Sequence, residues 1–205
     1  MNKIKSLYEK LNKEYGPPEG QWKVWCKRPK SLKEKEEVII GAVLTQRTNW
    51  NNVEKCFEKM KKEGIDSLRG LYDLGKKDIK KLFPLIRSSG FYRSKADYLF
   101  RVCEFFVKEC NGVKKAQGKK IDKIREELLG LKGVGKETAD SILLYALEKP
   151  IFVIDEYTKR IVRKEGISNN DSYDYLQNLF HKNLFKNWRL YQDFHALIVI
   201  SGQKK

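Results

Sequence analysis

The spacing of apolar residues constrains the fold of this chain more than any other feature, because that spacing is helical almost throughout. Ile4, Leu7 and Leu11 recur at intervals of three and four residues, and the apolar positions of 139–146 follow the same period. The segment 150–155, PIFVID, is too short to build a sheet. The pattern therefore predicts an all-α protein.

Helix-breaking residues divide this pattern into two parts. Residues 16–33 are rich in Pro, Gly and Lys, and Pro150 interrupts the pattern a second time. We therefore predict a helical body over 31–149 and a second helical lobe formed by 1–30 together with 150–205.

Short polar side chains mark where two of these helices begin. Asn49 or Asn51 can cap the helix that carries Val53, and Ser94 with Asp97 is typical of a capping box. Each stands before an apolar run at helical spacing, so each predicts a helix start.

The balance of charge indicates the class of partner. The chain has 43 Lys and Arg against 27 Asp and Glu, which gives a net charge of +16. A soluble protein with this excess of cations is expected to bind a polyanion, and nucleic acid is the first candidate. A cationic surface that serves only solubility is the alternative.

Other features bound the compartment and the redox state. Residues 1–10 lack the apolar core of a signal peptide, and no run approaches the roughly 20 apolar residues of a membrane span. We expect an intracellular protein without membrane contact, in the cytoplasm or nucleoid if its source is prokaryotic. The cysteines contain no C-x-x-C pair, which predicts reduced, buried thiols and no metal site. They are Cys26, Cys56, Cys103 and Cys110.

A glycine turn joins two of the predicted helices, 121–131 and 136–147. Gly133 and Gly135 can both adopt positive φ, and neither has a side chain that would block an approaching ligand. Backbone N–H groups in such a turn can bind an anion such as a DNA phosphate. The predicted phosphate-binding residues are Lys132, Gly133, Val134, Gly135 and Lys136. The alternative is a plain turn between two core helices.

A lone carboxylate, Asp155, follows the second of these helices. It precedes EYTKRI, so it can cap that helix, and it can also stabilise positive charge in a reaction. His181 and His195 have no partner at ligand or triad spacing, and we assign both to structural roles.

Four segments in order resemble the helix-hairpin-helix DNA glycosylases of the endonuclease III superfamily. They are GAVLTQRTNW, SGFYRSKA, LKGVGKETAD and VIDEYTKRI, within about residues 36–165. The resemblance implies that Asp155 is the catalytic aspartate. It also implies that Gln46 and Phe91 enter the DNA stack when a damaged nucleotide is turned out of the duplex.

Two departures from the superfamily pattern refine this resemblance. Bifunctional members carry a lysine nucleophile at the position of Glu137, and Lys136 is rotated by about 100° from that position on a helix. The chain also lacks the terminal cysteines that hold an iron–sulfur cluster in many members. Both features resemble the 3-methyladenine glycosylases of the endonuclease III type, and this implies a base pocket formed by Trp50, Trp22 and Trp25. Packing in the protein core is the alternative for these tryptophans.

The sequence thus predicts two helical lobes with a DNA-binding cleft between them. The expected activity is that of a monofunctional DNA glycosylase, which removes an alkylated purine from double-stranded DNA without a cofactor or a metal, as a monomer. Action on a deaminated or oxidised base remains the alternative within the same fold. A non-catalytic DNA-binding protein remains the alternative outside enzymes.

Overall fold

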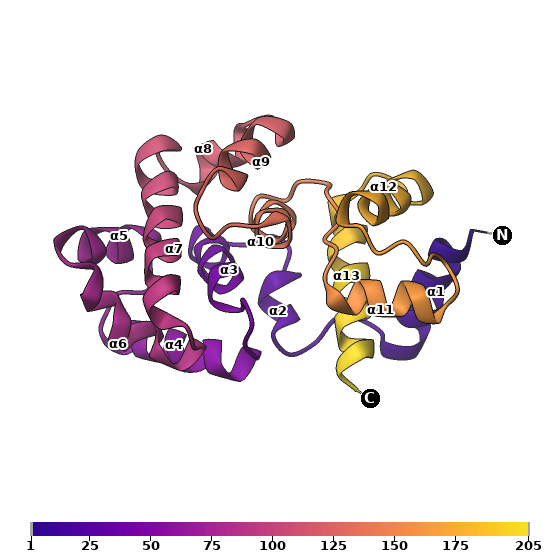
Figure 1. Ribbon diagram of the computed structural model, residues 1–205, viewed down its shortest axis with the longest axis horizontal. Coiled ribbons are helices and arrows are strands. Elements are labelled where there is room, and N and C mark those ends of the chain that lie inside the picture. Colours follow the sequence, from indigo (N-terminus) through magenta and orange to yellow (C-terminus); the bar gives the residue numbers. More distant parts are fainter. Residues whose placement is uncertain (1, 205) are drawn as a thin grey trace. The chain divides into compact units, whose positions relative to one another are not determined.

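The structure is a computed structural model that describes residues 2–204, and the regular structure within these residues is entirely helical (Figure 1). The all-α prediction is therefore confirmed. The α-helices are α1 (Lys3–Tyr15), α2 (Trp22–Trp25), α3 (Leu32–Leu44), α4 (Trp50–Lys62), α5 (Leu68–Lys77), α6 (Phe83–Ile86), α7 (Tyr92–Glu104), α8 (Val113–Gly118), α9 (Ile121–Leu129), α10 (Lys136–Ser141), α11 (Glu156–Lys164), α12 (Tyr173–Asn183) and α13 (Trp188–Gln203). Short 3-10 turns η1 (Ile79–Leu82) and η2 (Arg87–Ser89) and π-helical turns η3 (Phe105–Glu109) and η4 (Ile142–Ala146) complete the helical structure.

The chain forms two compact units. One consists of Met1–Pro29 and Leu143–Lys205, and the other of Lys30–Ile142. The second boundary lies within η4 rather than at Pro150, since η4 bonds to α13. Leu144 O accepts a hydrogen bond from Gln192 Nε2 at 2.7 Å, so the end of this helical segment packs with the first unit.

Helix α13 is the central helix of the first unit, and α1 and α11 pack against it (Figure 1). Phe194 and Leu197 are fully buried on α13, and Ile4 and Leu11 bury the apolar stripe of α1. The sequence periodicity of α1 therefore forms a core face, as expected.

Helix α7 packs against α3, α5 and α6 in the second unit (Figure 1). The predicted capping box before α7 is wrong, because the helix begins earlier, at Tyr92. Gly90 and Phe91 turn the chain with φ of 70° and 45°, and Ser94 therefore lies inside the first turn. In α4 the expectation is met, since Asn49 caps the helix by accepting a hydrogen bond from the Asn52 amide.

The cysteines follow their prediction in part. Cys56, Cys103 and Cys110 are buried, whereas Cys26 is partly exposed at the end of α2. None of the helices within residues 2–204 combines the length and the apolar character that a bilayer span requires.

Candidate functional site

The glycine turn connects α9 to α10 and has a defined conformation. Gly133 adopts φ 85°, whereas Gly135 has φ −86° and precedes α10 in an extended conformation. The expectation of positive φ thus holds at one glycine only. Val134 is 6 % exposed and its N–H donates to Leu131 O at 3.0 Å, which fixes the turn against the body of the second unit.

The two glycines differ in how far the protein itself requires them. A Cβ at Gly133 would lie 2.2 Å from the Tyr98 ring, so packing as well as φ excludes a side chain there. A Cβ at Gly135 would meet nothing within 4 Å. Neither backbone conformation nor packing within the protein explains the glycine at 135, and this position is exposed.

A buried ion pair joins the two helices of the hairpin. Arg125 on α9 donates from Nε and from a terminal nitrogen to the two carboxylate oxygens of Asp140 on α10, at 2.7 and 3.0 Å. The Asp140 side chain is fully buried. A bidentate arginine–carboxylate pair is strong and directional, and no motif in the sequence indicates this one.

A hollow of about 680 Å³ in the second unit brings together the residues predicted for the DNA stack and the hairpin. Phe91 is 66 % exposed at its edge. Gln46 Nε2 donates to Gly133 O at 2.9 Å and to Thr138 Oγ1 at 3.0 Å, so its side chain is bound to the hairpin. The lining residues are Gln46, Arg47, Phe91, Ser94, Lys95, Tyr98, Gly133, Val134, Gly135, Glu137 and Thr138.

Two lysines flank the hairpin on its exposed side. Lys132 is largely exposed, and its ammonium lies 3.2 Å from Asp97 Oδ2. Lys136 is exposed in the first turn of α10. Both lysines thus lie on the exposed side of the turn, where an anion that approaches the turn would meet them.

Asp155 is the N-cap of α11 in the first unit. Its Oδ1 accepts hydrogen bonds from the Thr158 N–H at 2.7 Å and from Thr158 Oγ1 at 2.8 Å. The side chain retains 12 % exposure. One carboxylate oxygen therefore holds the helix start, and the other, Oδ2, is directed to different neighbours. The capping role predicted for Asp155 is confirmed, and it leaves Oδ2 outside the cap.

His195 on α13 is the principal neighbour of that second oxygen, a partner that the spacing of the sequence did not indicate. His195 Nε2 lies 3.5 Å from Asp155 Oδ2, and Nδ1 lies 2.7 Å from the Tyr145 hydroxyl. Packing of α11 on α13 brings together residues that are far apart in the sequence. His181 does have a structural role, since Nε2 accepts a hydrogen bond from the Phe152 N–H at 2.9 Å.

These neighbours control the charge of Asp155. Burial favours the neutral carboxyl, but His195 and the two Thr158 hydrogen bonds outweigh it, and the pKa of Asp155 is lowered. The carboxylate thus stays ionised at neutral pH although it is mostly shielded from water.

Trp22 and Trp25 form an aromatic cluster in the same unit. Their rings are 5.7 Å apart, Trp25 lies 5.1 Å from Tyr145, and Trp22 lies 5.9 Å from His195. Both are more than nine-tenths buried, and Trp22 Nε1 has no hydrogen-bond acceptor among the described residues. Trp50 belongs to the other unit, where it is half-buried on α4 and donates from Nε1 to Glu54 at 2.9 Å.

Comparison with known families decides the assignment. Residues 40–186 match the model of the HhH-GPD superfamily of base excision DNA repair proteins. The chain belongs to this superfamily. It is therefore a base excision repair glycosylase, and the predicted membership of the helix-hairpin-helix glycosylases is confirmed.

Individual relatives of this HhH-GPD protein agree with the family. A Methanocaldococcus jannaschii protein assigned as a DNA repair glycosylase is 44 % identical over 168 residues, which cover 80 % of this chain and 74 % of the relative. Endonuclease III of Thermotoga maritima is 32 % identical over 140 residues, or 67 % of this chain and 61 % of that protein.

A solved structure extends the likeness to nearly the whole chain. The H. pylori 3-methyladenine DNA glycosylase bound to 1,N6-ethenoadenine aligns with a TM-score of 0.78 and 32 % identity over 98 % of this chain and 96 % of that chain. A trapped covalent complex of endonuclease III with DNA aligns with a TM-score of 0.74 at 21 % identity, over 98 % of this chain and 85 % of that chain. This second match supports the fold.

The donor groups of this HhH-GPD protein do not fit an iron–sulfur cluster. Within the part of the chain that the structure describes, no three His, Cys, Asp or Glu side chains converge at ligand spacing. The cysteines lie on separate elements, and the described end of α13 contains none. The residues present therefore offer no ligand set for such a cluster.

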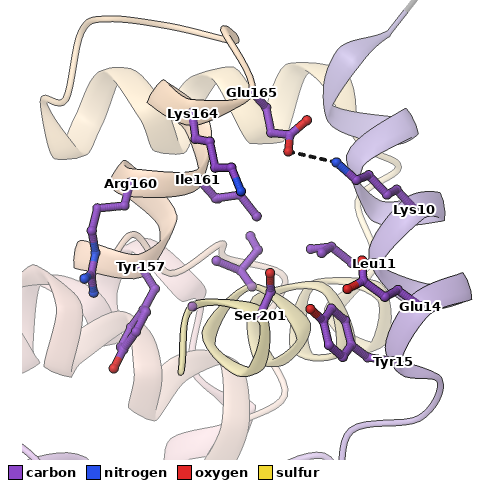
Figure 2. A pocket seen from close by; sticks show the side chains of 12 residues that line it. Lys10, Leu11, Glu14, Tyr15, Tyr157, Arg160, Ile161, Lys164, Glu165 and Ser201 are labelled. Carbon is purple, nitrogen blue, oxygen red and sulfur yellow. Dashed lines mark hydrogen bonds and ion pairs between the residues drawn. The ribbon is translucent and has the colours of Figure 1, made fainter. Parts of the chain in front are cut away.

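A cavity of about 340 Å³ in the first unit lies between α1, α11 and α13 (Figure 2). Lys10 crosses it to Glu165 at 2.9 Å, and Arg160 stacks over Tyr157 at 4.5 Å. None of the residues predicted for catalysis, base binding or phosphate binding lines this cavity. We therefore do not assign it to the candidate site.

Proposed function

We propose that this protein is a monofunctional DNA glycosylase that hydrolyses the N-glycosidic bond of an alkylated purine. The observation that carries the proposal is Asp155, an ionised carboxylate with one oxygen bound to Thr158 and the other beside His195. A carboxylate held in this way stabilises positive charge that develops on a deoxyribose as the base departs. It also orients or deprotonates the water that attacks the sugar.

The base must leave the stack before the bond is cleaved, at a cost of a few kcal/mol in stacking and pairing. We assign Phe91 and Gln46 to fill the space that the displaced base leaves in the DNA stack. Phe91 is exposed and held in a left-handed turn, which presents its ring to the solvent. Gln46 would have to exchange its bonds to Gly133 and Thr138 for contacts with DNA.

The proposal assigns the base pocket to the tryptophans. A cationic alkylated purine is attracted to an indole face by stacking and by cation–π interaction. Trp22 and Trp25 adjoin His195 and Tyr145, and the buried Trp22 N–H has no acceptor in the described protein. We include Trp50 as a further stacking residue. The name and ligand of the H. pylori relative support an alkylated purine as the substrate.

Base removal without strand cleavage follows from Glu137. Bifunctional superfamily members place a lysine at this position, and its amine forms a Schiff base with the sugar. Glu137 occupies the first turn of α10 and lines the hollow beside Gly135. A carboxylate cannot form that adduct, so we infer hydrolysis alone.

A panel of duplexes tests the proposed function. Each carries one lesion, either methylated, etheno, deaminated or oxidised, and each is incubated with the protein with and without later alkali. We expect release of the alkylated purines and strand breaks only after alkali. Covalent trapping by borohydride would disprove hydrolysis alone, and exclusive release of uracil or an oxidised purine would disprove the substrate class.

We propose that the hairpin binds one DNA phosphate through its exposed turn, with Lys132 and Lys136 beside the turn. Gly135→Ala is expected to leave thermal stability unchanged, because its Cβ meets only open space in the protein. The same methyl group would obstruct a phosphate, so binding of undamaged duplex should weaken by about tenfold or more at low salt.

Gly133→Ala is the matched control in the same turn. The φ of 85° at this position, and the Tyr98 ring 2.2 Å from the added Cβ, should cause a clear loss of thermal stability. Thermal melts and fluorescence anisotropy separate the two effects. Unchanged DNA affinity in Gly135→Ala would contradict phosphate binding at this turn.

The pH profile should depend on His195. Asp155 acts as an anion, so the rate falls as the pH drops through its lowered pKa. His195→Gln removes the strongest of the interactions that lower this pKa, whereas burial still raises it, so the pKa of Asp155 should increase. The acid limb of single-turnover base release should therefore move to higher pH. His181→Asn is the control, and an identical shift in that variant would exclude a specific effect of His195.

A further inference from the structure

Lys95 is a buried cation that the proposed mechanism does not use. It lies in the first turn of α7 with 2 % exposure, although lysine side chains are rarely buried without a partner. Its Nζ donates to the carbonyl oxygens of Leu44 at 2.8 Å and Ser89 at 2.6 Å. A buried ammonium needs such acceptors, because its transfer from water is otherwise very costly.

The two carbonyls belong to the ends of separate helical segments. Leu44 is the last residue of α3, and Ser89 is the last residue of η2. Carbonyl oxygens at the C-terminal end of a helical segment have no N–H donor within that segment, so they can accept hydrogen bonds from other groups. Both therefore suit a cation, and Lys95 joins two segments that are distant in sequence.

Each of these segment ends leads directly into a strained turn. Arg47, which follows Gln46, has φ 53°, and Phe91 has φ 45°. Left-handed conformations at residues other than glycine cost about 1 kcal/mol or more and persist only when the surroundings enforce them. Gln46 and Phe91, the two residues proposed to enter the DNA stack, thus each stand two residues beyond a carbonyl that Lys95 binds.

We propose that Lys95 is a positioning residue that fixes these two turns relative to each other, so that Gln46 and Phe91 reach the DNA stack together. This inference rests on the proposed function. As a positioning residue, Lys95 touches neither base nor sugar. It acts on the step that opens the duplex, and the bond cleavage at Asp155 does not require it.

Substrates that differ in the cost of base opening test the proposal. The probe is 1,N6-ethenoadenine placed opposite thymine in one duplex and opposite an abasic site in another. Lys95→Met retains the length and the apolar stem but removes the donor. It should slow release opposite thymine by about ten- to a hundredfold and slow release much less opposite the abasic site. Lys115→Met, at an exposed lysine of α8, is the control.

A double-mutant cycle separates positioning from general destabilisation. If Lys95 acts through Phe91, then Lys95→Met should add little to the defect of Phe91→Ala. Additive losses, or equal losses with both duplexes, would overturn the proposal. No release by the wild-type protein from either duplex would instead count against the proposed function.

A measurement on the DNA-free wild-type protein tests the proposal even if Lys95→Met does not fold. Burial lowers the pKa of Lys95 to about 8, so the ammonium loses its proton as the pH rises through that value. The amide resonances of 45–47 and 89–91 should then titrate with one common midpoint near pH 8 in wild-type protein. Independent midpoints, or no change in either turn, would contradict the proposal that Lys95 fixes both turns.

Other ionisable groups near Lys95 must be separated from this titration. Cys56 faces it from α4, and burial raises the pKa of that thiol. Arg47 and Glu137 line the same hollow from the turn after α3 and from α10, while α3 and η2 present carbonyl oxygens. Cys56→Ser should retain the common midpoint, and its loss in this variant would assign the titration to the thiol and overturn the proposal.

Discussion

Replacing Asp155 by Asn is expected to slow base release by about a thousandfold or more, since it removes the charge that opposes the developing positive charge on the sugar. A factor of this size corresponds to about 4 kcal/mol of transition-state stabilisation. Asn is also a good N-cap, so it can accept the hydrogen bond from the Thr158 amide and retain the start of α11. The fold should survive, and affinity for damaged duplex should stay within about twofold.

The neighbouring carboxylate provides a matched control for this variant. Glu156 follows Asp155 in the chain, but its side chain is 73 % exposed and pairs with Lys159 at 2.7 Å. Glu156→Gln should therefore release base at close to the wild-type rate. Single-turnover assays with saturating protein measure chemistry apart from binding. A rate for Asp155→Asn within about tenfold of wild type would remove Asp155 from the mechanism.

Local sequence patterns were sufficient to predict the helices and the hairpin. The apolar stripe of α1, the cap at Asn49 and the turn around Gly133 depend on residues close together in the chain, and all three are present. Asp155 was identifiable for the same reason, because its capping role and its motif are both local. The failed capping box at Ser94 shows the limit, since Gly90 and Phe91 start α7 earlier.

Contacts between segments that are distant in the chain could not be predicted from the sequence. His195 lies beside Asp155 only because α13 packs on α11, and no spacing in the chain predicts this contact. Nothing in the sequence distinguishes Lys95 from the other cations of a chain with a net charge of +16, yet it is buried. Helical periodicity does identify Lys95 as a neighbour of Ala96 and Leu99, but only the fold supplies its two carbonyl partners.

The hairpin shows how a local motif depends on such a contact. Its turn residues are recognisable in the sequence, but α9 and α10 are joined by the ion pair of Arg125 with Asp140. Gln46 adds hydrogen bonds from the end of α3 to the same hairpin. The Arg125–Asp140 pair does not involve Gln46, so it can hold the turn after Gln46 exchanges its hydrogen bonds for contacts with DNA. Loss of the pair is therefore expected to affect both stability and DNA binding.

Asp140→Asn is expected to lower the free energy of unfolding by about 3 kcal/mol, because it leaves the Arg125 guanidinium without its anionic partner beside a buried amide. For a chain of this size the loss corresponds to a decrease in Tm of roughly 6–12 °C. Asp73→Asn is the control, since the Arg69–Asp73 pair is exposed and should contribute less than about 1 kcal/mol. Thermal melts and urea unfolding measure both variants.

An apolar replacement of both partners distinguishes loss of the pair from loss of the helix contact. Arg125→Met combined with Asp140→Leu removes both charges together, and such exchanges are often neutral or stabilising in buried sites. The double variant should therefore recover much of the stability that Asp140→Asn loses. DNA affinity should follow the same order, because the phosphate-binding turn is held by the same two helices. Equal losses in Asp140→Asn and Asp73→Asn would show that the buried pair does not stabilise the hairpin.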